Sequence, residues 1–193
     1  KRVLITEHAR LTDRCTRQLN NIEMKNRERS ALQGAPYLKS EEDMIMLKGI
    51  PKILSPELLM VLAEMGHSDR IVIADGNFPA ESMGKDSIVI RCDGHGVPEI
   101  LDAILQVFPL DTYVEKPVNL MQLMPDDVGK VETPIWDTYK EIVKKHDDRG
   151  EAAIGNIERF AFYDEAKTAY AIIATGESAI YANVMLQKGV VVE

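Results

Sequence analysis

The feature that most constrains the fold is a helix followed closely by a short, wholly apolar strand. Ser55 can cap a helix and Pro56 suits its first turn, so a helix is predicted from there to Gly66. The strand, residues 71–74 (IVIA), has the composition of strands that are buried on both faces in parallel sheets. Asp75 comes directly after it, and ligands of open α/β sheets bind beyond the carboxyl ends of strands. Asp75 is therefore predicted to lie at a binding site.

The rest of the chain continues the alternation of helices and strands. Pro98 can open a second helix, and Thr133 with Pro134 can cap and begin a third. Such alternation predicts a layered α/β/α domain with a largely parallel sheet. Further strands are predicted at residues 88–90, 111–114, 120–124, 170–174 and 180–186, and further helices at 98–108, 135–143 and 160–168.

Composition excludes several classes of function. Of the 193 residues, 45% are hydrophobic and 28% charged, which is typical of a globular protein, and no apolar run is long enough to span a membrane. The net charge of −8 argues against nucleic acid as a partner, because nucleic-acid binding needs a basic surface. The two cysteines, Cys15 and Cys92, do not form a disulfide framework, so a cytoplasmic location is expected.

A change in charge divides the chain near residue 44. Residues 1–43 hold nine Lys and Arg against seven Asp and Glu, whereas the remaining 150 residues hold 14 against 24. We expect residues 1–43 to form an N-terminal extension, either helical or poorly ordered, and residues 44–193 to form the main domain.

Three side chains in the first half of the domain could carry chemistry. His67 follows a helix and can give or take a proton near neutral pH, although a histidine there could equally serve as a surface group that compensates the helix dipole. Asp75 and Asp111 could bind a ligand, or each could order its own turn through an Asx hydrogen bond.

Four more candidates lie near the C-terminus. Arg159 and Tyr163 are four residues apart on a predicted helix and so share one face, unless Arg159 instead pairs with a neighbouring acid. Tyr181 and Asn183 are two apart on a predicted strand and would project to the same side, as alternate polar residues do on any edge strand.

Three other motifs predict little. The turn at residues 94–99 (GHGVPE) has Glu99 where a dinucleotide fingerprint needs its third glycine. Cys92 and His95 lack a second pair of ligands, so zinc is not expected. Because the fingerprint is incomplete, a nucleotide cofactor is not expected either. Ser178 lacks the flanking pattern of a nucleophile elbow, which leaves hydrolase chemistry unsupported.

Five blocks in the same order resemble the RbsD/FucU family, and within it the L-fucose mutarotases. The blocks are KGIPKILSPELLMVLAEMGHSDRIVIADGNFP, IRCDGHGVPEILDAIL, FPLDTYVEKP, ERFAFYDEAKTAYAIIATGE and YANVMLQKGV, and the resemblance covers residues 46–192. It implies an RbsD-like fold and exchange of the α and β anomers of L-fucose without a cofactor. It also implies that His67 is catalytic and that six side chains bind the sugar, namely Asp75, Asp111, Arg159, Tyr163, Tyr181 and Asn183.

Mutarotation needs only acid–base chemistry: the ring oxygen gains a proton while the anomeric hydroxyl loses one. Ala182 stands where fucose-type members often have glycine and ribose-type members alanine, so ribose stays open as a substrate. Two other classes also stay open, a sugar-binding accessory protein without turnover and a nucleotide-binding protein.

The resemblance further implies a ring-shaped homo-oligomer, a decamer in bacterial members, with sugar sites between neighbouring chains. His67 and Asp75 are eight residues apart, which is ~26 Å if that segment is fully extended. Either residues 68–70 fold back, or the pocket draws on two adjacent chains.

Overall fold

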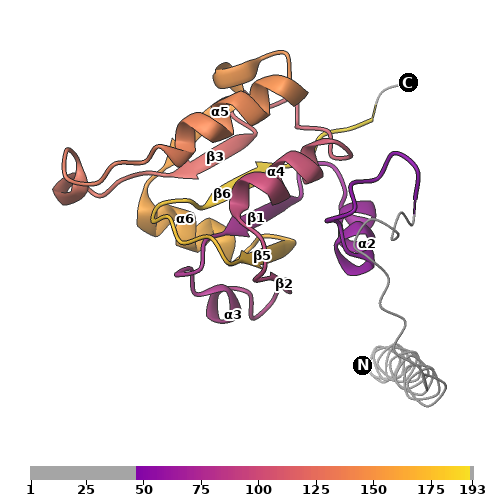
Figure 1. Cartoon of the computed structure of the whole chain (residues 1–193), viewed down its shortest axis with the longest axis horizontal. Coiled ribbons are helices and arrows are strands. Elements are labelled where there is room, and N and C mark those ends of the chain that lie inside the picture. The colour runs from indigo at the N-terminus through magenta and orange to yellow at the C-terminus, as the bar shows by residue number, and fades with distance from the viewer. Residues whose placement is uncertain (1–46, 192–193) are drawn as a thin grey trace, which may run out of the picture. The chain divides into compact units, whose positions relative to one another are not determined.

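A six-stranded sheet with the order β2-β5-β1-β6-β3-β4 organises the computed structural model (Figure 1). The structure describes residues 47–191, so the predicted extension, residues 1–43, lies outside the described part. The strands are β1 (Arg70–Ala74), β2 (Ile88–Cys92), β3 (Val118–Met121), β4 (Ile154–Ile157), β5 (Ala171–Thr175) and β6 (Val184–Gln187).

Five strands run in one direction and β6 runs in the other. The pairs β1–β5, β2–β5 and β3–β4 are parallel, whereas β6 is antiparallel to both β1 and β3. The largely parallel sheet predicted from the sequence is thus confirmed. Because Ile73 pairs with Val184, the reversal of β6 brings the residues that follow β1 beside those that precede β6.

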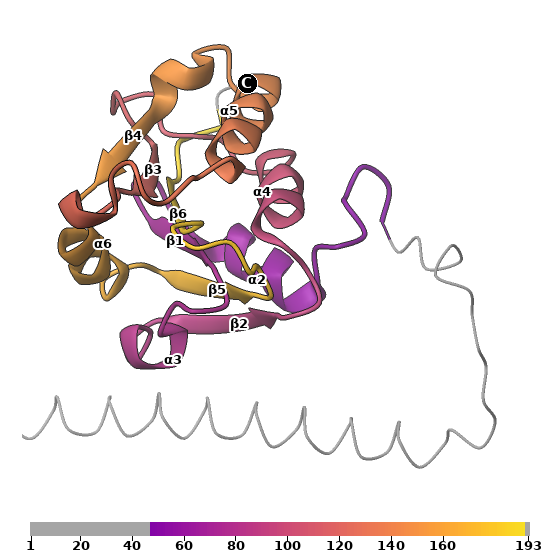
Figure 2. The same ribbon diagram turned by 60° about the vertical axis from the view of Figure 1, so that its left-hand side comes forward.

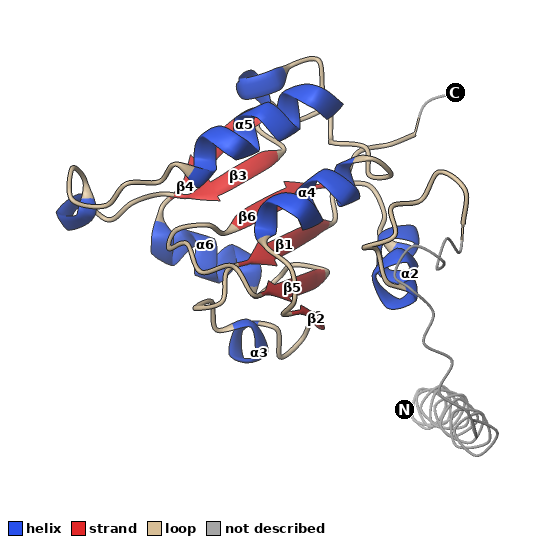
Figure 3. Ribbon diagram, in the orientation of Figure 1, coloured by secondary structure: helices blue, strands red, loops and turns tan. Residues whose placement is uncertain are grey.

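Helices cover both faces of the sheet, as the layered α/β/α prediction required. Alternate residues of β1 face opposite ways: Ile71 and Ile73 pack with α2, α4 and α5, whereas Val72 and Ala74 pack with α3 and α6. Figure 2 shows α4 and α5 on one side of the sheet and α6 on the other, and Figure 3 separates helices from strands by colour. The helices are α2 (Pro56–Glu64), α3 (Ala80–Met83), α4 (Val97–Leu105), α5 (Ile135–His146) and α6 (Arg159–Ala166), with short 3₁₀ turns η2 (Pro125–Asp127) and η3 (Gly150–Ala153).

The start of α2 is as predicted, but its end is not. The Ser55 hydroxyl accepts a hydrogen bond from the Leu58 amide at 3.1 Å, which caps the helix. Gly66 does not stop the helix, because Met65 already has an extended conformation. The Lys188 ammonium group donates to the carbonyl oxygens of Leu62 and Met65, so a distant lysine satisfies the end of α2.

The strand predicted at residues 111–114 is wrong. The Asp111 carboxylate accepts from the Tyr113 amide at 2.9 Å, and Arg149 donates to the carbonyl oxygens of Asp111 and Val114 at 3.0 and 3.1 Å. Side chains therefore satisfy the polar backbone groups of this segment, which forms bends instead of a ladder.

Other predicted boundaries of helices and strands also differ from those in the structure. The strand predicted at residues 180–186 begins only at Val184, because Tyr181 has a left-handed backbone with φ 57°. Residues 118–121, and not 120–124, form β3. Thr133 does not cap α5 with its side chain. No local pattern predicted α3 or β4, and Gly155 and Asn156 of β4 are weak strand formers.

None of the helices within residues 47–191 is long and apolar enough to cross a membrane.

Candidate functional site

A pocket of about 310 Å³ opens where β1 ends and β6 begins. Five of the seven predicted site residues line it: Asp75, Arg159, Tyr163, Tyr181 and Asn183. The sequence did not single out the other residues that line it, Asn77, Phe78, Met121, Asp127 and Ile180.

Asp75 is buried, and its amide and carboxylate make four hydrogen bonds. Its amide donates to Asn183 Oδ1 at 2.9 Å, and its Oδ2 accepts from Asn183 Nδ2 at 2.8 Å and from the Ala182 amide at 3.3 Å. Its Oδ1 accepts from the Asn77 amide at 3.0 Å, so the predicted Asx turn is also present. Burial raises the pKa of the Asp75 carboxyl, and the hydrogen bonds to its oxygens lower it by less. Asp75 thus combines a structural turn with a carboxylate at the pocket.

Arg159 and Tyr163 share one face of α6, as their spacing predicted. The Arg159 guanidinium lies 5.8 Å from the centre of the Tyr163 ring, and Phe78 packs against that ring at 5.5 Å. The two acids nearest to Arg159 in the sequence have other partners. Glu158 caps α6 through the amides of Phe160 and Ala161, and Asp164 pairs with Lys167 at 2.7 Å. The guanidinium is therefore positioned by an aromatic ring at the pocket.

Helix α5 supports the backbone that carries Tyr181 and Asn183. The Trp136 indole donates to the Tyr181 carbonyl and the Tyr139 hydroxyl donates to the Ala182 carbonyl, both at 2.8 Å. The prediction that Tyr181 and Asn183 project together from a strand is wrong, because both precede β6. They still meet at the pocket, where the left-handed turn and α5 place them.

Asp127 reaches the pocket from the 3₁₀ turn η2. Its carboxylate accepts the hydrogen bond of the Tyr181 hydroxyl, and the Met124 amide donates to the same phenol oxygen at 3.4 Å. Burial and this contact with Asp127 raise the pKa of Tyr181. Asp127 and Tyr181 are separated by 54 residues, so no local pattern could have revealed the pair.

The other two predicted residues, His67 and Asp111, contact each other but lie outside this pocket. His67 Nε2 is 3.1 Å from Asp111 Oδ2, which also accepts from Gln187 Nε2 at 2.9 Å. Asp111 is 1% exposed, whereas the His67 side chain is 42% exposed and packs against the Tyr113 ring at 5.3 Å. Burial alone would raise the pKa of Asp111, but the hydrogen bonds from Tyr113, Gln187 and His67 together lower it. The pair is thus an accessible imidazole held by a buried carboxylate.

Strand β1 separates these two groups of residues. His67 precedes the strand and Asp75 follows it, and the five residues of β1 span roughly 16 Å. The turn before β1 is compact, since the Gly66 amide donates to Asp69 Oδ2 at 2.6 Å, yet the strand still lies between His67 and Asp75. One chain therefore presents the pocket and the imidazole at opposite ends of its central strand.

The glycine-rich turn before α4 is filled by carboxylates. Glu99 accepts from the Gly96 amide at 2.7 Å, and a side chain at Gly96 would lie 3.0 Å from a carboxylate oxygen of Glu177. These acids repel a phosphate group at the start of α4. Within residues 47–191, no three His, Cys, Asp or Glu side chains are grouped to hold a metal ion.

Comparisons with known proteins agree on one family. A model of the RbsD / FucU transport protein family matches residues 48–191. Human fucose mutarotase is 50% identical over 149 residues, which are 76% of this chain and 96% of the human protein.

Two solved structures are similar over the same part of the chain. FucU from Bifidobacterium longum is 67% identical, with a TM-score of 0.73, over 75% of this chain and 100% of that one. The fucose mutarotase from Streptococcus pneumoniae, solved in complex with L-fucose, is 46% identical, with a TM-score of 0.70, over 76% of this chain and 100% of that one.

Proposed function

Because the chain belongs to the RbsD/FucU family, we propose that it is an isomerase that interconverts the α and β anomers of L-fucose. The observation that carries the proposal is the pocket that unites a buried carboxylate, a guanidinium and two phenols: Asp75, Arg159, Tyr163 and Tyr181. Such groups bind several hydroxyls at once. Ribose remains a second candidate substrate because of Ala182.

The charge of the pocket favours a neutral sugar over a sugar phosphate. Asp75 and Asp127 place two carboxylates around the space, and Arg159 provides one cation. Phe78, Met121 and Ile180 add apolar surface, against which the C–H face of a pyranose can pack. This combination suits a deoxy sugar, which has hydroxyls and a methyl group.

The reaction needs a group that moves protons. In mutarotation the ring oxygen is protonated while the anomeric hydroxyl is deprotonated, the carbonyl form rotates, and the reverse transfers close the other anomer. A positioned acid–base group contributes about 10²–10⁴-fold to such a step. We assign this role to His67, whose ring Asp111 orients through the 3.1 Å contact.

We propose that His67 reaches the sugar in a neighbouring chain. The pocket and His67 lie at opposite ends of β1, so a head-to-tail contact between chains would bring them together. Apolar side chains are exposed at both ends: Ile180 (49%) at the pocket, Phe160 (61%) next to Arg159, and Tyr113 (77%) beside His67. A contact that joins two different ends forms a ring when the rotation between neighbouring chains closes. We propose such a ring, with a decamer as its size, because the resemblance to the family implies it.

We also propose a cytoplasmic location, which the low cysteine content supports.

Exchange NMR on the anomeric protons tests the activity. Catalytic amounts of protein should accelerate the α–β exchange of L-fucose above its rate in buffer, and a parallel series with ribose shows the preference. Exchange at the buffer rate for both sugars would contradict the proposal. The His67→Ala variant distinguishes an enzyme from a sugar-binding accessory protein. If the protein is an enzyme, this variant should lose anomer exchange while it keeps most of its affinity for L-fucose.

A mixing experiment tests the shared site. His67→Ala and Arg159→Met chains are each expected to be inactive, but their co-assembled mixture should recover activity. In a ring of equal and random composition, about one site in four would combine an intact pocket with an intact histidine. A mixture with no recovery, or an active monomer by light scattering, would overturn the shared site while it leaves the mutarotase activity standing.

A further inference from the structure

The segment between β3 and α5 approaches the pocket with one acid, Asp127. Figure 1 shows this segment extending away from the sheet. The backbone of Asp127 is fixed, since its amide donates to the Met124 carbonyl at 2.9 Å and its carbonyl accepts from the amides of Lys130 and Val131 at 3.0 Å. The carboxylate of Asp127 therefore has a defined position at the pocket wall.

The hydrogen bonds of Tyr181 leave its phenol oxygen able only to accept from a ligand. A phenol has a single proton, and Tyr181 donates it to Asp127 Oδ2. The Met124 amide uses one lone pair of the phenol oxygen, which leaves a second lone pair. Within the part of the chain that the structure describes, no group donates to Asp127 Oδ1. Asp127 Oδ1 thus offers an acceptor to a ligand, and Tyr181 has no proton left to donate to one.

We propose that Asp127 is a specificity-determining residue of the sugar site. By accepting the hydrogen bond of Tyr181, Asp127 leaves the Tyr181 hydroxyl able only to accept from the sugar. Asp127 also accepts a hydrogen bond from the sugar itself. This inference rests on the proposed function. Arg159 has only donors, whereas the Asp127 carboxylate has only acceptors, and both line the pocket. A sugar must place a hydroxyl that donates toward Asp127 and Tyr181. An analogue without that proton leaves acceptors unpaired and is rejected.

Deoxyfluoro sugars test this directly, because fluorine replaces a hydroxyl in size but cannot donate a proton. We would measure the dissociation constants of L-fucose and of its 2-, 3- and 4-deoxyfluoro analogues by calorimetry. In the unmodified protein, one analogue should bind at least about 30-fold more weakly than L-fucose. In Asp127→Asn, whose amide can donate to fluorine, that ratio should fall to about threefold. Asp126→Asn is the matched control, since Asp126 is the exposed neighbour in the same turn, and it should keep the original ratio.

A spectroscopic measurement checks the contact between Asp127 and Tyr181 on which this role depends. Because Asp127 raises the pKa of Tyr181, Asp127→Asn should form one tyrosinate at lower pH, seen in the absorbance near 295 nm. The shift should be absent when Tyr181→Phe is the background. The inference alone would be overturned if Asp127→Asn still bound L-fucose and the ratio of the dissociation constants of analogue and L-fucose were the same as in the unmodified protein. Failure of the unmodified protein to bind any of these sugars would overturn the proposed function as well.

Discussion

Asn183 holds Asp75 twice, by accepting from its amide at 2.9 Å and donating to its carboxylate at 2.8 Å. Both residues are almost fully buried, and the contact joins positions 108 residues apart. Asn183 was predicted to bind the sugar, yet its side-chain amide is largely used by Asp75. We therefore assign to Asn183 the positioning of the Asp75 carboxylate at the pocket.

Replacing Asn183 should weaken both the fold and the site. Asn183→Ala leaves the Asp75 amide and carboxylate without these partners, at an expected cost of about 1–3 kcal/mol in the free energy of unfolding. Urea denaturation measures this cost, and L-fucose affinity should fall in the same variant. Asn156→Ala, at an exposed position of β4, should change stability by less than about 0.5 kcal/mol. Equal losses in the two variants would contradict the role of Asn183.

Replacing Asp111 should impair His67. Asp111→Asn removes the charge and places an amide group near two donors, His67 Nε2 and Gln187 Nε2, so anomer exchange at pH 7 should fall by about tenfold or more. Asp86→Asn, an exposed change of the same charge, should leave exchange unchanged. If exchange in Asp111→Asn stayed within twofold of the unmodified protein, the orienting role would be wrong.

Helix α5 should control the geometry of the pocket. Tyr139→Phe removes the hydrogen bond to the buried Ala182 carbonyl, so the free energy of unfolding should fall by about 1–3 kcal/mol. KM for L-fucose should also rise severalfold, because Tyr181 precedes Ala182 in a left-handed turn. Tyr170→Phe is the control, since its hydroxyl contacts Glu64 at an exposed site. A loss of stability with no change in KM would leave Tyr139 only a structural role.

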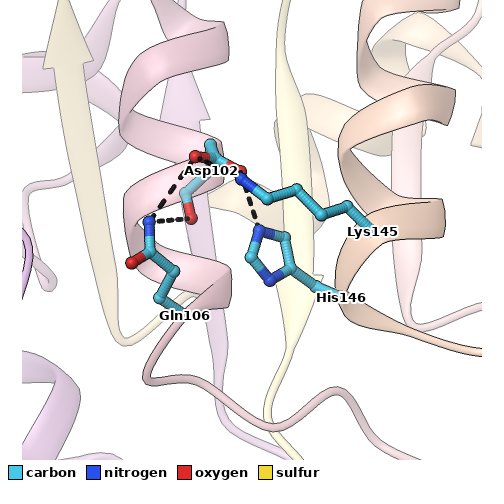
Figure 4. Close-up of polar contacts among 4 residues, drawn as sticks. All are labelled: Asp102, Gln106, Lys145 and His146. Carbon is cyan, nitrogen blue, oxygen red and sulfur yellow. Dashed lines mark hydrogen bonds and ion pairs between the residues drawn. The ribbon is translucent and has the colours of Figure 1, made fainter. Parts of the chain in front are cut away.

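The contact between α4 and α5 should make stability depend on pH. Asp102 lies between Lys145 Nζ at 2.8 Å and His146 Nε2 at 2.7 Å, with Gln106 on its other side (Figure 4). The hydrogen bond from Lys145, then that from His146, lowers the pKa of Asp102 below its usual 3.8. The ionised carboxylate therefore stabilises the fold above pH 3.8, and this stabilisation is lost as pH falls through the lower pKa of the folded state.

Asp102→Asn should consequently reduce stability at pH 7 by up to about 1 kcal/mol, because Lys145 is 61% exposed and the ion pair is screened. Thermal melts of the two proteins should converge as pH falls below about 4. A difference that persisted unchanged at pH 2.5 would show that packing, and not charge, is responsible.

Local patterns predicted most of the elements correctly. The Ser55 cap, the apolar run of β1 and the apolar faces of α4 and α5 all depend on neighbours within a few residues, and each appears where it was expected. The wrong strand at residues 111–114 had a strand-like composition, but Arg149 takes the carbonyl groups that a ladder would need. Arg149 is more than 30 residues away, so its effect was not visible locally.

By itself, the sequence determined which segments are helices and strands and which polar side chains are candidates for the site, because capping, periodicity and burial are local properties. Only the tertiary structure decided how those candidates are grouped. The antiparallel pairing of β6 with β1 brings Asn183 to Asp75, and the turn η2 adds Asp127 at Tyr181. The same strand β1 keeps His67 and Asp111 at its other end. Strand order and direction follow from how the whole sheet buries its two faces, and no segment of the chain contains that information alone.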